Sequence, residues 1–306
     1  MKVVLVGFGS IGKRHYKNLS MLSKDKILIC TKQKIDRNKK DLEIFHSIED
    51  CLKEKPEIAL VTNVTNLHVN VATKVANAGC HIFIEKPLSN SLSGLQNLLN
   101  IVEKKKLIDE KKIGKIISVY AENGSYLPYW HPSENYKKNY AARDDMGGGV
   151  VLTCIHEIDY LYWLFGNVSE VSSITGKFGH LGINSDDLSA VIMKFKNNVV
   201  AELHLDYLQR PSSRYCKIIG TRGTILWDFR TNTVQYYDIV KKRWFIVTKL
   251  TNYDFNQMYV EEMKHFLKCV KNNKNTINGI DDGLKILKIA MAILKSSKKK
   301  NFVRLE

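Results

Sequence analysis

The stretch MKVVLVGFGSIGKRHYKNL, residues 1–19, decides the fold of the N-terminal part of the chain. Residues 1–6 form a short apolar run that predicts a buried strand. Beyond the glycines, Ile11, His15 and Leu19 recur at the spacing of one helix face. A G-x-G-x-x-G motif between a strand and a helix is the context in which this motif binds a dinucleotide. The stretch therefore predicts the first strand, turn and helix of a dinucleotide-binding domain.

The glycines of this turn have separate roles in such a domain. Gly7 permits the tight turn, Gly9 lets the backbone approach a pyrophosphate, and Gly12 lets the helix pack closely on the strand. Free amides and the positive end of the helix dipole attract phosphate at a helix N-terminus. We therefore expect the phosphates to bind at residues 7–12, with Ser10 and Ile11 at the start of the helix.

Strand and helix patterns alternate through the next hundred residues. Apolar runs at 26–31, 57–62 and 81–85 predict three further strands. Apolar stripes at helical spacing predict helices around 67–75 and 92–102. This alternation is typical of an α/β domain of the Rossmann type, a parallel sheet covered on both faces, which binds its cofactor at the carboxyl ends of the strands.

The pattern changes after about residue 110. Most segments then alternate apolar and polar residues, as in KIISVYAEN (115–123), which is typical of antiparallel strands. Two amphipathic stretches close the chain. We expect a dinucleotide-binding domain over residues 1–108 and a C-terminal α+β domain with a large, mostly antiparallel sheet over residues 109–306.

Composition narrows the function. The chain has 306 residues and a net charge of +16, but its lysines are spread along the sequence without a basic, aromatic-rich stripe, so we expect no nucleic-acid partner. Six cysteines without a C-x-x-C pair predict neither a disulfide framework nor a metal site. No apolar run approaches the roughly 18 residues of a membrane span, and no signal-peptide pattern is visible, so we expect no membrane partner and a cytoplasmic location.

Cofactor choice is often made at the end of the second strand, where an acidic residue can bind a ribose 2′-hydroxyl. Here the sequence TKQK offers Thr31 and Lys32 and no acid. A lysine attracts a 2′-phosphate, which favours NADP over NAD. Lys32 as an ordinary surface lysine, and hence NAD as the cofactor, is the alternative.

The fourth predicted strand ends in IEKP, residues 84–87. The proline keeps Lys86 extended and ends the strand, so the lysine would project where a nicotinamide lies. There it can hydrogen-bond a substrate hydroxyl and help to relay its proton. The alternative is a solvated lysine at a strand end.

Four segments together resemble the glucose-fructose oxidoreductase and inositol dehydrogenase family (Gfo/Idh/MocA) over nearly the whole chain. They are GFGSIG, VTNVTNLHVNVATKVANAGCHIFIEKPLS, GGGVVLTCIHEID and DDGLKILKIAMAILKSS. The resemblance implies that Lys86 and His156 lie beside the nicotinamide and the substrate. It further implies a cofactor crevice lined by Thr62, Asn63, Asn66, His68 and Glu85. A nucleotide-sugar or surface-glycan substrate would fit the resemblance.

The third of these segments carries the predicted acid/base group. On a helix, His156, Asp159 and Tyr160 share one face, whereas Glu157 points elsewhere. Neutral His156 would accept the proton of an alcohol as hydride leaves its carbon, and Asp159 would orient the imidazole or bind a sugar hydroxyl. A metal pair, which lacks a third ligand, and a core hydrogen bond are the alternatives.

The segment 126–149 before this helix is dense in aromatic and polar residues and predicts a substrate wall. Aromatic faces stack on sugar rings, and arginine binds carboxylate or phosphate. The candidates are Trp130, His131, Tyr140 and Arg143, together with Asp159 and Tyr160 of the helix. An open antiparallel sheet also makes a homo-oligomer, a dimer or a tetramer, the expected assembly.

The chain departs from the family at two places. Leu152 and Thr153 stand where many relatives carry an aspartate one turn before the histidine. The sequence also runs through residues 104–108 without the strand that relatives usually have next. The function expected is NAD(P)-dependent hydride transfer at a secondary alcohol or ketone of a sugar or nucleotide-sugar. A dinucleotide-binding sensor that lost turnover is the alternative.

Overall fold

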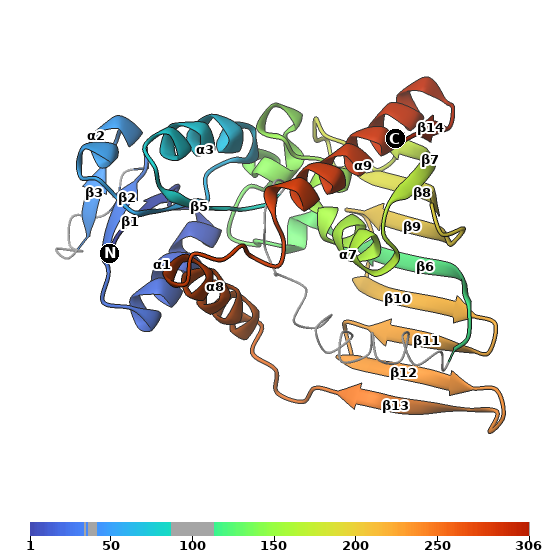
Figure 1. Ribbon diagram of the computed structural model, residues 1–306. Coiled ribbons are helices and arrows are strands. Elements are labelled where there is room, and N and C mark those ends of the chain that lie inside the picture. Colours follow the sequence, from blue (N-terminus) through green and yellow to red (C-terminus); the bar gives the residue numbers. More distant parts are fainter. Residues whose placement is uncertain (34, 36–41, 87–112, 306) are drawn as a thin grey trace. The chain divides into compact units, whose positions relative to one another are not determined.

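The computed structural model describes residues 1–33, 35, 42–86 and 113–305 (Figure 1). The chain forms two compact units, Met1–Ser93 with Phe255–Leu284, and Gly94–Asp254 with Lys285–Glu306. The expected boundary after residue 108 and the expected helix at 92–102 lie outside the described residues, as does the segment 104–108. The return of residues 255–284 to the first unit differs from the single boundary that we expected.

The first unit is built on a five-stranded parallel sheet in the order β3-β2-β1-β4-β5. Its strands are β1 (Lys2–Val6), β2 (Lys26–Cys30), β3 (Glu43–Phe45), β4 (Ile58–Val61) and β5 (His81–Ile84). The four strands predicted from apolar runs are confirmed. The edge strand β3 was not predicted, because three half-buried residues are too few to show a period.

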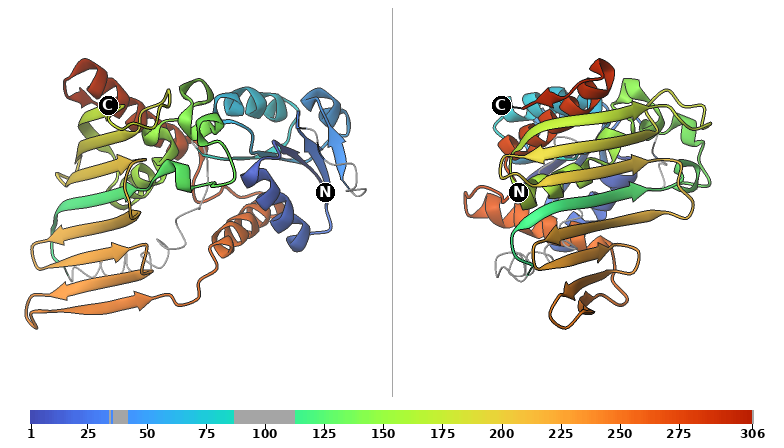
Figure 2. Two further views of the ribbon diagram at one scale, coloured as in Figure 1. Left: turned by 180° about the vertical axis from the view of Figure 1, so that it is seen from behind. Right: turned by 90° about the vertical axis from the view of Figure 1, so that its right-hand side faces the viewer.

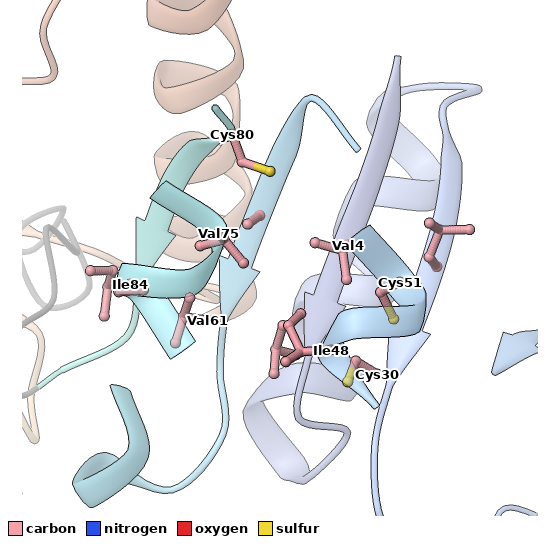
Figure 3. Packing of buried hydrophobic residues seen from close by; sticks show 12 residues of the cluster. Val4, Cys30, Ile48, Cys51, Val61, Val75, Cys80 and Ile84 are labelled. Carbon is pink, nitrogen blue, oxygen red and sulfur yellow. The ribbon is translucent and has the colours of Figure 1, made fainter. Parts of the chain in front are cut away.

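Helices cover both faces of this sheet. Helix α1 (Ser10–Leu22) and helix α8 (Asn256–Lys271) share one apolar core with β1, β4 and β5. Helix α2 (Ile48–Lys53) and helix α3 (His68–Asn77), which follows the short 3-10 turn η1 (Thr65–Leu67), cover the other face. Figure 3 shows this second core, in which Ile48 and Cys51 of α2 pack over Val4 and Cys30 of the strands. The sheet is therefore buried on both sides, as its continuous apolar strands require.

The second unit is built on a nine-stranded sheet in the order β13-β12-β11-β10-β6-β9-β8-β7-β14. The strands are β6 (Ile116–Gly124), β7 (Val168–Gly176), β8 (Leu188–Phe195), β9 (Val200–Asp206), β10 (Ser213–Gly220), β11 (Gly223–Asp228), β12 (Thr233–Asp238), β13 (Arg243–Lys249) and β14 (Val303–Arg304). All neighbours pair antiparallel except β6 and β9, which are parallel. The expected mostly antiparallel sheet is confirmed.

One face of this sheet packs against helices. Asn123 of β6 donates to Glu157 of helix α7 (Ile155–Phe165), and Ser173 of β7 donates to the carbonyl oxygen of Ile293 in helix α9 (Ile280–Lys299). The opposite face, turned to the viewer in the right-hand view of Figure 2, carries no helix among the described elements. None of the described helices is both long enough and apolar enough to cross a membrane.

Short 3-10 turns connect β6 to the next helices of the same unit. They are η2 (Leu127–Tyr129), η3 (Tyr136–Lys138), η4 (Tyr140–Ala142) and η5 (Asp144–Met146). They lead into helix α6 (Val150–Thr153), which directly precedes α7. The segment predicted to form a substrate wall is therefore a chain of tight turns in front of the His156 helix.

Candidate functional site

The glycine turn after β1 leaves room for a ligand at Gly9. A Cβ atom on Gly7, whose φ is +97°, would lie 2.6 Å from the Cα of Asn63, and one on Gly12 would lie 2.2 Å from the carbonyl oxygen of Gly7. A Cβ on Gly9 would meet nothing within 4 Å. Gly7 and Gly12 thus serve backbone packing, and Gly9 borders open space.

The N-terminus of α1 is free to bind an anion. Gly9 caps the helix without a side-chain hydrogen bond, and the first turn holds no acidic residue. Ser10 is exposed and Ile11 is half-buried at the first two helical positions. The amides of this turn therefore have no acidic competitor in their own turn, which suits the pyrophosphate of a dinucleotide.

Four of the predicted cofactor residues lie at or just after the end of β4. The buried hydroxyl of Thr62 donates to the carbonyl oxygens of Val6 and Gly7, at 3.1 and 2.9 Å, and so holds the glycine turn against β4. Nε2 of the buried His68 donates to the carbonyl oxygen of Asn63 at 2.8 Å. These three hydrogen bonds fix the backbone beside the glycine turn.

One buried acceptor beside the glycine turn has no donor within the described part of the chain. Oδ1 of Asn63 is buried and has no hydrogen-bond partner among the described residues. A buried acceptor without a donor costs about 1–3 kcal/mol, which a hydroxyl or amide of a bound dinucleotide would offset. Asn66, in η1, is exposed. The residues at the end of β4 therefore fit a dinucleotide that approaches Gly9.

The end of β2 holds the predicted selectivity residues. Thr31 is buried, with 6% of its surface exposed. Its hydroxyl accepts from the amide of Gln33 at 3.1 Å, and the carbonyl oxygen of Thr31 accepts from Nδ1 of His46 at 2.8 Å. Lys32 is exposed. Residue 34, the second lysine of the TKQK sequence, lies outside the described residues.

The end of β5 holds a buried ion pair. Nε2 of His15 in α1 lies 2.5 Å from Oε1 of Glu85, and Oε2 of Glu85 accepts from the amide of Lys86 at 3.3 Å. His15 is fully buried, and Lys86 is half-buried. The sequence marked His15 only as one position of a helical stripe, and a histidine in an otherwise apolar stripe was the available sign.

Burial and pairing oppose each other at this ion pair. Burial disfavours the charged form of His15, but the hydrogen bond and charge of Glu85 outweigh it and raise the pKa of the imidazole. Burial would also raise the pKa of Glu85, but the hydrogen bond and charge of His15 bring that pKa below its usual value. Both directions favour an imidazolium beside a carboxylate.

The stretch predicted as one helix around His156 is two helices. The helix is interrupted at Cys154, which lies between α6 and α7 and has φ and ψ of −92° and 25°. His156 is the second residue of α7 and is half-buried, and Asp159 lies three positions on and is 5% exposed. His156 and Asp159 therefore lie three positions apart within the one helix α7, as expected. Gly149, with φ +100°, caps α6 in front of them.

Glu157 turns toward the sheet rather than to the His156 side. Its Oε1 accepts from Nη2 of Arg214 at 2.7 Å and from Nδ2 of Asn123 at 3.1 Å, and the side chain is fully buried. Cys154 is also buried, and burial together with the charge of Glu157 raises the pKa of its thiol. A raised thiol pKa opposes a nucleophilic role, so Cys154 serves as a small buried residue of the core.

The predicted substrate wall divides into surface and core residues. Nε1 of Trp130 donates to the hydroxyl of Ser125 at 2.8 Å, His131 is exposed, and Tyr140 is 40% exposed. Nε of Arg143 donates to Oδ1 of Asp145 at 3.0 Å, and its Nη2 to Oδ2 at 2.5 Å. An exposed pair of this kind contributes little to stability, so a ligand anion can displace Asp145.

Tyr160 differs from the other wall candidates. It is 3% exposed, and its ring meets Trp227 of β11 edge-on at 5.7 Å. Burial strongly raises the pKa of its hydroxyl, with a smaller effect from the charge of Glu157. This placement gives Tyr160 a packing role in the core, because one side of an amphipathic helix must face the sheet.

Each unit carries its own set of candidate groups, and none of the described groups forms a metal site. Among the residues that the structure describes, no group of three His, Cys, Asp or Glu side chains could hold a metal ion. The six cysteines are unpaired and buried. The first unit holds the glycine turn and a lysine after β5. In the second unit, α7 carries the imidazole of His156 and, three residues on, the carboxyl group of Asp159.

Comparison with known proteins gives a family for both parts of the chain. Residues 1–109 match the family model described as "Oxidoreductase family, NAD-binding Rossmann fold". Residues 105–305 match that of "Oxidoreductase family, C-terminal alpha/beta domain". The two matches together cover nearly all of the 306 residues.

Two relatives that match nearly the whole chain are inositol dehydrogenases. The chain is 25% identical to the myo-inositol 2-dehydrogenase of Thermotoga maritima, over 100% of this chain and 99% of that protein. It is 23% identical to the scyllo-inositol 2-dehydrogenase (NAD(+)) of Bacillus subtilis strain 168, over 97% and 94%.

Solved structures share the fold across the whole chain. A levoglucosan dehydrogenase in complex with NADH has a TM-score of 0.85 at 17% identity and covers 100% of this chain and 99% of its own. The WlbA dehydrogenase from Bordetella pertussis, in complex with NADH and UDP-GlcNAcA, has a TM-score of 0.79 at 18% identity, over 100% and 98%.

Proposed function

The chain belongs to the Gfo/Idh/MocA oxidoreductase family, and from that membership we propose that it transfers hydride between the nicotinamide of NAD(P) and a secondary alcohol or ketone of a sugar or nucleotide-sugar. The observation that carries the proposal is the open space at Gly9, which borders a helix N-terminus without an acidic residue in its first turn. The names of the relatives, which act on inositols, support the substrate class.

In this proposal the residues of the first unit bind and orient the cofactor, which supplies a hydride acceptor or donor. The amides after Gly9 hold the pyrophosphate, and Oδ1 of Asn63 accepts from a hydroxyl or amide of the dinucleotide. Lys86 hydrogen-bonds the reacting oxygen of the substrate and stabilises its developing negative charge.

The residues of α7 move the proton. Neutral His156 takes the proton of the alcohol as the carbon is oxidised, and it returns the proton in the reverse direction. Asp159 orients the imidazole or binds a neighbouring hydroxyl of the sugar. Trp130, His131, Tyr140 and Arg143 contact the rest of the substrate, and an anionic substituent would displace Asp145 from Arg143.

The acid/base role has a direct test. The variant His156→Ala is expected to lower turnover by about a hundredfold or more, because general acid–base catalysis contributes that much, with the dissociation constant of NADH nearly unchanged. The measurement is NADH absorbance with a panel of inositols, sugars and nucleotide-sugars, next to NADH titration by fluorescence. The exposed His180 supplies the matched control, His180→Ala, with wild-type turnover expected. Wild-type turnover in His156→Ala would overturn the role.

The same panel decides between an enzyme and a sensor. The sequence at residues 104–108, which lacks the strand pattern expected there from the resemblance, favours a chain that binds a dinucleotide without turning it over, whereas the presence of Lys86 and His156 opposes this alternative. NADH binding by the wild-type chain without an absorbance change on any member of the panel would support this second candidate.

NADP rather than NAD is the cofactor we propose, because Lys32 is exposed at the end of β2 and no acid follows that strand in the TKQK sequence. The variant Lys32→Glu is expected to weaken NADPH binding relative to NADH by about fivefold, equivalent to about 1 kcal/mol for an exposed charge pair. Paired fluorescence titrations of the two cofactors measure this ratio. The control Lys24→Glu changes the same charge at another exposed lysine, and an equal effect there would remove the assignment.

We also propose a cytoplasmic homo-oligomer, a dimer or a tetramer. Six unpaired, buried cysteines suit a reducing compartment. The outer face of the nine-stranded sheet exposes four large apolar residues on the three strands β7, β8 and β13, namely Ile174, Ile192, Trp244 and Ile246, at 65%, 43%, 44% and 62%. Cross-strand registers place these residues on the face opposite Asn123. These exposed apolar residues, near both ends of the open face, are the reason that we propose self-association through this face.

A further inference from the structure

The ion pair of His15 and Glu85 lies next to Lys86, the residue that the proposed function places beside the substrate. His15 is fully buried in α1, and its Nε2 is 2.5 Å from Oε1 of Glu85. The second oxygen, Oε2, accepts from the backbone amide of Lys86 at 3.3 Å. One carboxylate thus joins the glycine-turn helix to the backbone of the lysine.

The strand order shows which elements this connection joins. In the sheet, β4 lies between β1, from which α1 departs, and β5, from which Lys86 follows. The amide of Glu85 still donates to the carbonyl oxygen of Val61 in β4, at 2.9 Å, so the end of β5 keeps its ladder position. The His15 side chain therefore reaches past one strand to a second element of the dinucleotide site.

The surroundings leave the imidazole little freedom. The ring of Phe83 in β5 meets it edge-on at 5.1 Å and the ring of Tyr259 in α8 at 6.0 Å. A ring enclosed by other rings on two sides keeps its rotamer. The direction of Nε2, and with it the place of the Glu85 carboxylate, is then set by packing.

We propose that His15 is a positioning residue for hydride transfer: it fixes the Glu85 carboxylate, which in turn orients the backbone from which the Lys86 side chain departs. The proposal rests on the role proposed for Lys86. A displacement of about 1 Å in a group that must meet the reacting oxygen can cost about a hundredfold in rate. His15 itself touches neither substrate nor cofactor in this account.

The charges around the pair determine how the connection responds to pH. Glu85 from the end of β5 and Glu262 from α8 raise the pKa of His15, whereas burial and Arg14 from α1 lower it, with a net rise. Tyr259 of α8 faces the same ring and holds the guanidinium of Arg14 at 4.5 Å from its centroid.

The sign of the pH effect follows from these directions. The folded pKa of His15 lies above its usual value of about 6.5, so its charged bond is complete below that pH and weakens as the pH rises through the raised pKa. The folded pKa of Glu85 lies below its usual value, so its contribution is lost only as the pH falls through that lower pKa. The ion pair is therefore expected to hold the Lys86 backbone firmly near pH 6 and to hold it less firmly as the pH rises above the pKa of His15.

Two variants separate positioning from folding. In His15→Gln an amide donor replaces Nε2 and does not titrate, whereas in His15→Phe an aromatic ring of similar shape has no donor. We expect His15→Phe to lower kcat by about tenfold to a hundredfold with little change in KM or in the NADH dissociation constant. His15→Gln is expected to recover most of kcat, and the alkaline change of the wild-type profile should disappear.

A readout without turnover uses the Lys86 amide. In protein labelled with 15N-lysine, the Lys86 signal is assigned by its loss in Lys86→Gln. We expect this signal to shift in His15→Phe, to stay near its wild-type position in His15→Gln, and to move with pH above about 6.5 in the wild type only.

The outcomes distinguish the two proposals. An unchanged Lys86 signal in a folded His15→Phe would overturn the positioning role, as would a lower melting temperature with unchanged kcat. Failure of His15→Gln to restore either readout would do the same. If the wild-type chain transfers no hydride at all, the proposed function fails, and the Lys86 signal still decides whether His15 positions it.

Discussion

At the scale of single residues, the three glycines of the G-x-G-x-x-G turn are not equivalent. Gly12 has no room for a Cβ because the carbonyl oxygen of Gly7 lies 2.2 Å from that position, whereas a Cβ on Gly9 meets nothing within 4 Å. Gly9 also has a φ of −72°, which an alanine adopts without strain. The difference separates a folding role from a binding role.

The pair of alanine variants tests this separation. Gly9→Ala is expected to keep the wild-type melting temperature and to weaken NADH binding by about tenfold or more, because the methyl group would occupy the space of the pyrophosphate. Gly12→Ala is expected to lower the melting temperature as well, since a backbone contact must give way. Calorimetry and NADH titration measure the two quantities. A Gly9→Ala variant that binds NADH normally would place the phosphates elsewhere.

At the scale of elements, α7 is tied to the sheet by a buried charge pair. Arg214 of β10 reaches Glu157 at 2.7 Å, and its guanidinium also lies 4.8 Å from the ring centroid of Phe229. Glu157 is the residue after His156, so the pair fixes the first turn of α7 against the sheet. The pair thereby fixes the rotation of α7 about its axis, and with it the direction in which His156 faces.

Removal of one partner is expected to be costly. Arg214→Met leaves the Glu157 carboxylate buried without its cation, and such a change costs about 3–5 kcal/mol of unfolding free energy. Urea unfolding followed by circular dichroism measures the loss. The double variant Arg214→Met with Glu157→Met removes both charges and should recover most of the stability. An Arg214→Met variant as stable as the wild type would show that the pair does not hold α7.

At the scale of the whole molecule, the outer face of the nine-stranded sheet is the surface that we propose for self-association. Ile192 lies on β8, two strands from the β14 edge, and pairs with Ser172 and Glu202 on the neighbouring strands. We expect Ile192→Arg to shift the mass measured by light scattering toward the monomer, because a charge in an apolar interface is not compensated. Met21→Arg, at a residue of α1 that is 60% exposed, is the matched control. A wild-type chain that is already monomeric at high concentration would contradict the proposed assembly.

Much of both sheets was predictable because the information is local. The glycine turn, the apolar runs of β1, β2, β4 and β5, and the alternation of the later strands each occupy a few consecutive residues. The three-residue strand β3 escaped prediction because a period needs more residues than that to show. The parallel pairing of β6 with β9 escaped it too, because pairing joins residues that are about eighty positions apart.

The candidate site was predictable in part for the same reason. The motifs pointed to Gly9, Lys86 and His156, since backbone turns and strand ends constrain which residue types occur there. They did not show the break at Cys154, which arises where two short helices pack separately. Nor did they show the burial of Tyr160 against Trp227, because a helix pattern alone does not say which strand it meets.

The sequence by itself determined the two kinds of sheet, the dinucleotide turn and the family, because short-range patterns of glycine, apolar and polar residues encode them. Only the tertiary structure decided that α8 returns to the first unit, that His15 holds Glu85, and that Arg214 neutralises Glu157. These are contacts between residues about 60 to 250 positions apart. Their physical origin is burial: a charge taken out of water needs a partner, and only the packed chain shows which partner lies within reach.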